Sequence, residues 1–233
     1  MERTKPNRCK GLEDIFYIIE RLLGKSGCPW DRRQTPQTIQ TYLIEESHEA
    51  AAAVRAGKVE DVAEELGDLL FMAFFLVHLY ERRGDFGLGE VCRLISEKMV
   101  RRHPHVFGEM SVSSAKEVKD NWEKIKEAEK QESGKGASPV PDSLPALIRA
   151  HRILSRLSQK EDLDWNDVQN QGREFLKEST ELEREIRDGL HVSADRLGRL
   201  FVRLANLARL QDYRAEDILH EFLKKLEFTP SRK

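Results

Sequence analysis

Two acidic motifs, E-E-S-H-E at 45–49 and E-E-L-G-D at 64–68, determine how the chain is expected to fold. On an α-helix, residues three or four apart lie on the same face. The pairs that share a face here are Glu46 with Glu49 and Glu65 with Asp68. Two antiparallel helices joined by a short turn would bring the pairs together. Four converging carboxylates repel one another strongly unless a cation lies among them.

A divalent metal ion is the cation that suits such a cluster. Hard cations take oxygen ligands, and Mg²⁺ is usually shared between a few carboxylates and substrate phosphates. The sequence therefore predicts a Mg²⁺ site for a phosphorylated substrate, with Mn²⁺ as a substitute metal. The predicted metal ligands are Glu46, Glu49, Glu65 and Asp68.

The alternative is that these acidic residues form only a solvated helix face. The second cluster, however, runs directly into the apolar segment L-L-F-M-A-F-F-L-V at 69–77. A helix that is apolar all round is buried. Unpaired carboxylates at the head of a buried helix are costly to desolvate, which favours the metal site.

Composition narrows the class of protein. The 233 residues carry a formal net charge of −2, so no basic excess indicates a nucleic-acid polymer as partner. No apolar run reaches the length that spans a membrane, and the first ten residues lack the apolar core of a signal peptide. Three scattered cysteines without a C-x-x-C motif indicate reduced thiols and a cytoplasmic protein.

Helical periodicity runs through the whole chain, and strand signals are almost absent, so the predicted fold class is all-α. The predicted helices lie at about 11–23, 36–55, 59–80, 88–102 and 114–132, and then at 144–159, 170–188, 194–210 and 215–227. The segment S-G-K-G-A-S-P-V-P at 133–141 has the composition of a linker. We therefore predict a catalytic domain over 1–132, a linker over 133–143 and a second helical domain over 144–233.

The second domain contains an echo of the acidic motifs. K-E-S-T-E surrounds Glu178, and D-R-L-G-R-L-F surrounds Gly198, in the same order and at similar spacing. The residues that replace Glu45, Glu65 and Asp68 are Lys177, Arg196 and Arg199, and only Glu178 and Glu181 remain acidic. This pattern predicts a degenerate repeat that has lost its metal and serves packing or dimerisation. Chance similarity between two amphipathic helix pairs is the alternative.

Taken together, the motifs resemble the MazG family of all-α nucleoside triphosphate pyrophosphohydrolases. The matching motifs are G-C-P-W-D at 27–31, E-E-x-x-E at 45–49, E-E-L-G-D-L-L-F at 64–71, E-K-x-x-R-R-H-P-H-V-F at 97–107, W-E-x-I-K at 122–126, S-L-P-A-L at 143–147 and D-W at 164–165. The resemblance implies tandem helical-bundle domains in a homodimer. It also implies Mg²⁺-dependent hydrolysis of NTP to NMP and pyrophosphate, in nucleotide-pool housecleaning.

The resemblance also implies which residues bind the substrate. It places Lys98 and Arg102, which share a helix face, on the triphosphate. It places Lys126 on the phosphates, while Trp122 packs beside the nucleoside. Trp30 is a second candidate for contact with the base, and a buried structural tryptophan is the equal alternative.

Six carboxylates are the catalytic candidates: Glu45, Glu46, Glu49, Glu64, Glu65 and Asp68. Phosphoryl chemistry needs charge neutralisation and positioning more than covalent catalysis. Glu45 and Glu64 could support the metal ligands or help to activate the water that attacks the α-phosphorus. Six carboxylates exceed what one Mg²⁺ requires, so a two-metal site is also open.

Two other classes of protein compete with this interpretation. A ferritin-like di-metal protein uses Glu-x-x-His motifs, and Glu45 with His48 forms one, but a second motif is missing. A helical scaffold without catalysis would not need basic residues such as Lys98 and Arg102.

The apolar helix at 59–80 needs a partner on each apolar stripe, which predicts a homodimer with this helix at its interface.

Overall fold

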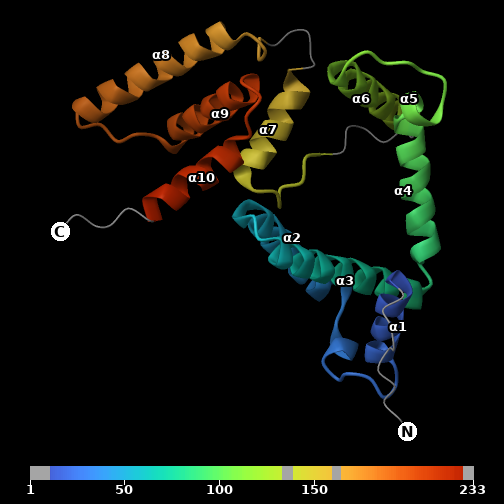
Figure 1. Ribbon diagram of the computed structural model, residues 1–233. Coiled ribbons are helices and arrows are strands. Elements are labelled where there is room, and N and C mark those ends of the chain that lie inside the picture. The colour runs from blue at the N-terminus through green and yellow to red at the C-terminus, as the bar shows by residue number, and fades with distance from the viewer. Residues whose placement is uncertain (1–10, 133–138, 159–163, 228–233) are drawn as a thin grey trace. The chain divides into compact units, whose positions relative to one another are not determined.

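A computed structural model describes residues 11–132, 139–158 and 164–227, apart from the side chain of Lys130. All regular elements in these ranges are helices, so the predicted all-α fold is confirmed (Figure 1). None of these helices is both long and apolar enough to cross a membrane. The chain divides into two compact units, residues 1–132 and 133–233. Part of the predicted linker, 133–138, lies outside the described residues.

Within residues 11–132, the described part of the first unit, the chain forms six α-helices and one short 3₁₀ helix. They are α1 (Leu12–Leu23), η1 (Asp31–Arg33), α2 (Pro36–Ala56), α3 (Val59–Arg83), α4 (Leu88–Arg102), α5 (Pro104–Phe107) and α6 (Ala115–Glu132). The predicted helices are all present, and α3 continues beyond its predicted end at Tyr80. Pro104 ends α4 as expected, but it also opens the one-turn helix α5, because proline suits the first helical position.

The second unit contains four helices within the ranges that are described. They are α7 (Ala146–Leu157), α8 (Val168–Arg187), α9 (Ala194–Leu210) and α10 (Ala215–Glu227). Asp167 caps α8 by accepting hydrogen bonds from the backbone amides of Gln169 and Asn170. Ser193 caps α9 in the same way through the amide of Arg196.

Local sequence explains why α2 and α3 form a hairpin. Thr35 and Thr38 make a reciprocal capping box at the start of α2, and Pro36 occupies the first helical position. Gly57 ends α2 with φ of 75°, a left-handed conformation that glycine adopts without steric cost. Only Gly57 and Lys58 separate α2 from α3, so the two helices pack against each other along their lengths (Figure 1).

The core of the first unit lies where α1 meets the α2–α3 hairpin. Its buried side chains are Ile19, Leu23, Ile39 and Phe75. Partly buried neighbours include Phe74, whose ring lies 4.8 Å from that of Phe16 between centroids. This core fixes the crossing of α1 and α3 and so holds the hairpin that carries the acidic motifs.

The apolar segment at 69–77 is less buried than the sequence suggests. Phe75 is 1% exposed, but it is the one fully buried residue of α3, whereas Leu66 and Leu70 are 46% and 44% exposed. The expectation of a helix buried all round is therefore wrong for a single chain. The physical reason is that α1 and α2 cover one side of α3 and leave a second apolar stripe in contact with solvent.

The second unit is built on an α8–α9 pair, against which α7 and α10 pack through α9 (Figure 1). Its core contains two buried polar side chains, Gln171 and Asn206. Asn206 donates hydrogen bonds to the Gln171 side chain and to the carbonyl of Trp165, each at 3.1 Å. Burying a side-chain amide is costly unless it is hydrogen-bonded, so this network is expected to hold the segment around Trp165 against α9.

Candidate active site

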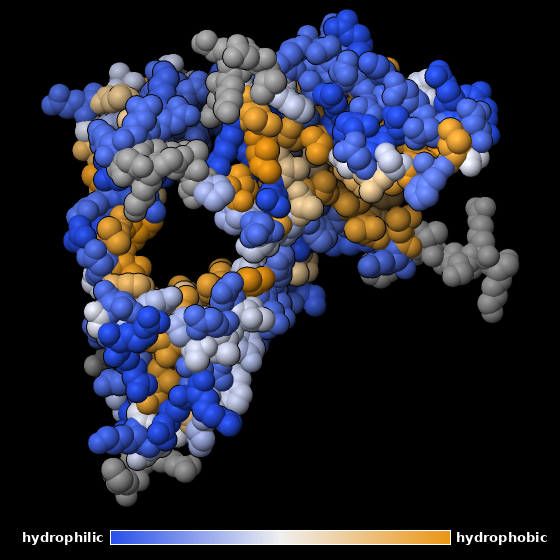
Figure 2. Space-filling model, turned by 180° about the vertical axis from the view of Figure 1, so that it is seen from behind, coloured by the Kyte–Doolittle hydropathy of each residue, from blue (hydrophilic) through white to orange (hydrophobic). Residues whose placement is uncertain are grey.

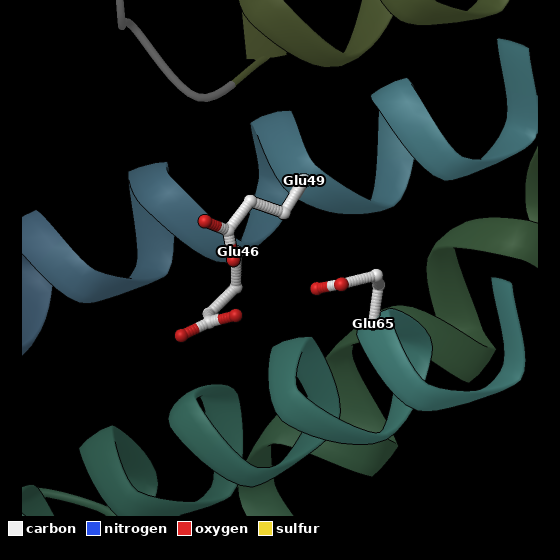
Figure 3. A group of neighbouring side chains, drawn as sticks. All are labelled: Glu46, Glu49 and Glu65. Atoms are coloured by element: carbon white, nitrogen blue, oxygen red, sulfur yellow. The ribbon is translucent and has the colours of Figure 1, made fainter. Parts of the chain in front are cut away.

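The hairpin brings three carboxylates from its two helices together. Glu46 and Glu49 extend from α2, and Glu65 extends from α3 toward them (Figure 3). One carboxylate oxygen from each residue lies within 4.8 Å of the chosen oxygens of the other two. The predicted same-face pairs thus converge as expected for three of the four proposed ligands.

The other acidic candidates lie around this group. Asp68 does not belong to the group of three whose oxygens lie within 4.8 Å of one another, but its negative charge repels the carboxylates of both Glu46 and Glu65. Glu45 is exposed next to Glu46, and Glu64 is exposed next to Glu65. His48 lies outside the carboxylate group, so the geometry gives no support to a ferritin-like Glu-x-x-His site.

Crowding changes the acidity of two members of the group. Partial burial raises the pKa of Glu46 above its ordinary value, and the charge of Asp68 raises it further. Partial desolvation likewise raises the pKa of Glu65, followed by repulsion from Glu49 and Asp68. Glu46 and Glu65 therefore resist ionisation beside their neighbours, and a bound cation would relieve this cost.

A pH dependence of metal-free stability follows from these raised pKa values. A folded-state pKa above the unfolded value adds stability below the unfolded pKa, and this is lost as pH rises through the folded pKa. We therefore expect the cluster to lower thermal stability in chelator as pH rises from the ordinary carboxyl range toward neutrality. Thermal unfolding at several pH values, with chelator or with Mg²⁺, measures this. Mg²⁺ should reduce the loss, and an unchanged pH slope would contradict the expectation.

The donor set suits a small hard cation. The oxygens of an octahedral Mg²⁺ site lie up to about 4.2 Å apart, close to the separations in the cluster. The three side chains of the group all offer carboxylate oxygens, which Mg²⁺ and Mn²⁺ accept as ligands. Glu46, Glu49 and Glu65 could therefore hold one such ion, with Asp68 as the adjacent fourth carboxylate.

The G-C-P-W-D loop places Trp30 beside α2. Gly27 lies so close to the end of α1 that an added Cβ would be 2.1 Å from the carbonyl oxygen of Leu22. The amide of Cys28 donates to that same oxygen at 2.8 Å. Trp30 then packs against Tyr42 with 5.9 Å between ring centroids, yet remains 49% exposed. The alternative of a buried structural tryptophan is therefore wrong, and base contact stays a prediction.

The predicted phosphate-binding residues gather elsewhere, on α4 and α6. Arg102 and Lys126 both lie over the ring of Trp122, at 5.0 and 4.9 Å from its centroid. Lys98 is a partly exposed residue of α4. α4 leaves the end of α3 and extends away from the hairpin (Figure 1). Within the described part of one chain, no ion pair joins these cations to the acidic cluster.

Sequence reasoning missed the carboxylates that hold these cations. Glu129 accepts hydrogen bonds from both Arg101 and Arg102, and Glu123 accepts from Lys126. The spacing of Trp122, Lys126 and Glu129 is i, i+4, i+7, which places them on one helix face. That spacing was the available signal, but it does not reveal the arginines on another helix.

In the second unit, the residues that echo the acidic motifs lie on α8 and α9 and contact one another. The Arg196 guanidinium lies among three carboxylates, 2.6 Å from Glu181, 2.9 Å from Glu185 and 3.4 Å from Glu178. Arg199 pairs with Glu178 at 3.1 Å. A hydrogen bond from Arg196 lowers the pKa of Glu181, opposite to the shifts in the first unit. These carboxylates are neutralised by side chains of the protein, which agrees with the predicted loss of a metal site.

Removing these carboxylates should separate stability from activity. We expect Glu178→Gln with Glu181→Gln to leave NTP hydrolysis unchanged, because these two carboxylates already pair with the guanidinium groups of Arg196 and Arg199. The same variant should unfold at a lower temperature, because Arg196, whose side chain is 15% exposed, loses two of its charged partners. Turnover and thermal unfolding are measured on the same preparation. A large loss of turnover in a folded dimer would contradict the assignment.

The comparisons with known proteins agree with the geometry. Residues 34–107 match the family model described as the MazG nucleotide pyrophosphohydrolase domain. A nucleoside triphosphate pyrophosphohydrolase of Escherichia coli (strain K12) is 34% identical over 222 residues, covering 93% of this chain and 84% of that protein. A Thermotoga maritima protein named nucleoside triphosphate pyrophosphohydrolase/pyrophosphatase MazG is 34% identical over 214 residues, covering 91% and 81%.

A solved structure also aligns with part of the chain. It is described as the crystal structure of a mazG-related protein from Thermotoga maritima, with 29% identity and a TM-score of 0.44, covering 50% of this chain and 99% of that one. The family is established by the sequence relatives, which match this chain over most of their length. The chain belongs to the MazG family of nucleotide pyrophosphohydrolases.

Proposed function

We propose that this protein hydrolyses nucleoside triphosphates to nucleoside monophosphates and pyrophosphate in a Mg²⁺-dependent reaction. The observation that carries the proposal is the convergence of Glu46, Glu49 and Glu65 within 4.8 Å, on a hairpin inside the family-matching segment. The names of the relatives from Escherichia coli and Thermotoga maritima support the same activity. The protein is accordingly a hydrolase that acts on acid anhydrides.

The carboxylates have two roles in this proposal. Glu46, Glu49, Glu65 and Asp68 hold the metal, and Glu45 or Glu64 accepts a proton from the attacking water. Bound Mg²⁺ supplies charge neutralisation on the phosphates and lowers the pKa of water. Burial and then repulsion between the carboxylates raise the pKa values of Glu46 and Glu65, and a cation bound among them would remove the repulsive part of this cost.

The basic residues offset the charge of the pyrophosphate that leaves. Lys98, Arg102 and Lys126 are the candidates, and Trp30 is the candidate for contact with the base. Electrostatic stabilisation of phosphoryl transfer requires these cations near the triphosphate. Since α4 extends away from the hairpin of its own chain, we propose that a partner copy supplies one part of each site.

A homodimer follows from the same reasoning. Leu66 and Leu70 expose an apolar stripe on α3, and apolar side chains at the surface are visible in Figure 2. A two-fold axis lets the same stripe on two chains cover itself. We further propose a cytoplasmic role in nucleotide-pool housecleaning, with no nucleic-acid polymer as partner, since the net charge of −2 offers no general attraction to one.

The test is product identification. The purified protein is incubated with each NTP and Mg²⁺, and the products are separated by ion-exchange chromatography. We expect NMP and pyrophosphate in equal amounts, and no products in excess chelator. NDP with orthophosphate, or turnover that persists in chelator, would overturn the proposal. A coloured or iron-loaded preparation would instead favour a di-iron protein.

A further inference from the structure

The strongest unassigned feature of the first unit is a charged cluster where α4 meets α6. It consists of Arg101, Arg102, Glu129, Trp122 and Lys126, and we call it the arginine clamp. Glu129 accepts a hydrogen bond from Arg101 Nε at 2.6 Å. It also accepts from Arg102 Nη2 at 2.6 Å and from Arg102 Nε at 3.1 Å. One carboxylate of α6 thus holds two neighbouring arginines of α4.

The pair of Arg102 and Glu129 is the part of this clamp that is sheltered from solvent. The Arg102 and Glu129 side chains are 14% and 18% exposed, whereas Arg101 is 53% exposed. Ion pairs at the surface contribute little because water screens them, but a partly buried bidentate pair fixes its geometry more strongly. The hydrogen bond from Arg102 and then that from Arg101 lower the pKa of Glu129 to about 2, so this carboxylate stays ionised at neutral pH.

The hydrogen-bond pattern leaves part of Arg102 available. A guanidinium has five N–H donors. Glu129 engages Nε and Nη2, and among the described residues no hydrogen bond involves Nη1 of Arg102. The ring of Trp122 supports the guanidinium at 5.0 Å. The guanidinium of Arg102 is therefore held in a defined orientation, and its Nη1 can still donate hydrogen bonds to a phosphate.

We infer that Glu129 is a positioning residue, which holds Arg102 against Trp122 so that its Nη1 edge is oriented for the phosphates of the substrate. The inference rests on the proposed function, because it assumes that the clamp faces a triphosphate. Glu129 does not touch the substrate and acts only through Arg102. Glu123 has a weaker version of this role, accepting from Lys126 at 3.2 Å.

The substitution Glu129→Gln tests this role. Gln keeps the shape of the side chain but loses the charge that orients both arginines. We expect kcat/KM for NTP to fall at least about tenfold. Most of the loss should be a rise in KM, because Arg102 is proposed to contact the phosphates already in the bound substrate, and a smaller fall in kcat should accompany it, because Arg102 is also proposed to offset the charge of the leaving pyrophosphate. Glu129→Asp keeps the charge with a shorter reach, so its KM should lie between those of the wild type and Glu129→Gln.

Glu117→Gln is the matched control on the same helix. Glu117 accepts hydrogen bonds from the amide and hydroxyl of Ser113 and touches no arginine of the clamp. This variant should lose some thermal stability and leave KM unchanged. An unchanged KM in Glu129→Gln would overturn the inference, and so would a lower KM, which would show that Glu129 competes with phosphate.

Binding of inorganic tripolyphosphate separates this inference from the proposed function. Calorimetry with the full-length wild-type protein should detect binding in the presence of Mg²⁺, and Glu129→Gln should weaken it about tenfold. If the wild type binds tripolyphosphate in this way but hydrolyses no NTP, the proposed reaction fails and the positioning role stands. If tripolyphosphate binds equally to both proteins, the positioning role fails whatever the activity.

Discussion

Glu49→Gln and Asp68→Asn are each expected to lower NTP hydrolysis by more than about 100-fold while leaving the helical fold intact. Each change removes one negative charge from the group that is proposed to hold the metal. Circular dichroism should show unchanged helix content, because both side chains are exposed and neither belongs to the core of the first unit. Turnover with each NTP at saturating Mg²⁺ is the measurement.

The same two variants should be more stable than the wild type in metal-free buffer, although their turnover is lower. Repulsion from Asp68 and Glu49 contributes to the raised pKa values of Glu46 and Glu65, so removing either charge relieves the folded state. We expect the thermal midpoint in chelator to rise by roughly 1–3 °C in either variant. The stabilisation that Mg²⁺ gives to the wild type should be lost.

Glu60→Gln is the control for both measurements. Glu60 is an exposed carboxylate in the first turn of the same helix, α3, outside the converging group. This variant should retain wild-type turnover and Mg²⁺ stabilisation. Full activity in Glu49→Gln or Asp68→Asn would show that the acidic cluster is not the catalytic metal site.

The fold and the acidic cluster could be anticipated because both depend on local rules. Helical periodicity, the Thr35-Pro36 start and the Gly57 end define α2, and the same rules define α3 after Lys58. Once two helices pack as a hairpin, the spacing of Glu46 and Glu49 and the position of Glu65 determine their convergence.

The remainder of the site depends on contacts between distant segments, which periodicity does not contain. The pairing of Arg102 with Glu129 joins α4 to α6, and its partners could have been any of the many acidic residues of α6. The same limit applies to burial. The segment at 69–77 predicts a buried helix, but how much of it one chain covers depends on the number of neighbouring helices, and Leu70 remains exposed.

The exposed stripe of α3 provides the second large prediction. Leu66 and Leu70 lie one turn apart on the same face, and neither belongs to the buried core of the unit. If this stripe forms the centre of a homodimer, a glutamate there would place a charge in a desolvated apolar contact on both chains. We expect Leu66→Glu and Leu70→Glu to weaken the dimer at least about 30-fold.

These positions distinguish dissociation from unfolding better than Phe74 does. Phe74→Glu should also remove the dimer and the activity, but Phe74 packs on Phe16 beside the core, so that variant would lose the fold of the unit as well. Leu12→Glu is a suitable control. Leu12 is also an exposed leucine, but it lies on α1, whereas the proposed interface lies on α3.

Light scattering and sedimentation at assay concentration measure the assembly, and turnover is recorded on the same samples. The wild type and Leu12→Glu should be active dimers, while Leu66→Glu and Leu70→Glu should be helical monomers with little turnover. Activity should return when the protein concentration is raised far enough to restore the dimer, because the partner's α4 and α6 are proposed to complete each site. A wild-type monomer that hydrolyses NTP at full rate would contradict this assembly, since one chain would then have to gather its cations and carboxylates without a partner.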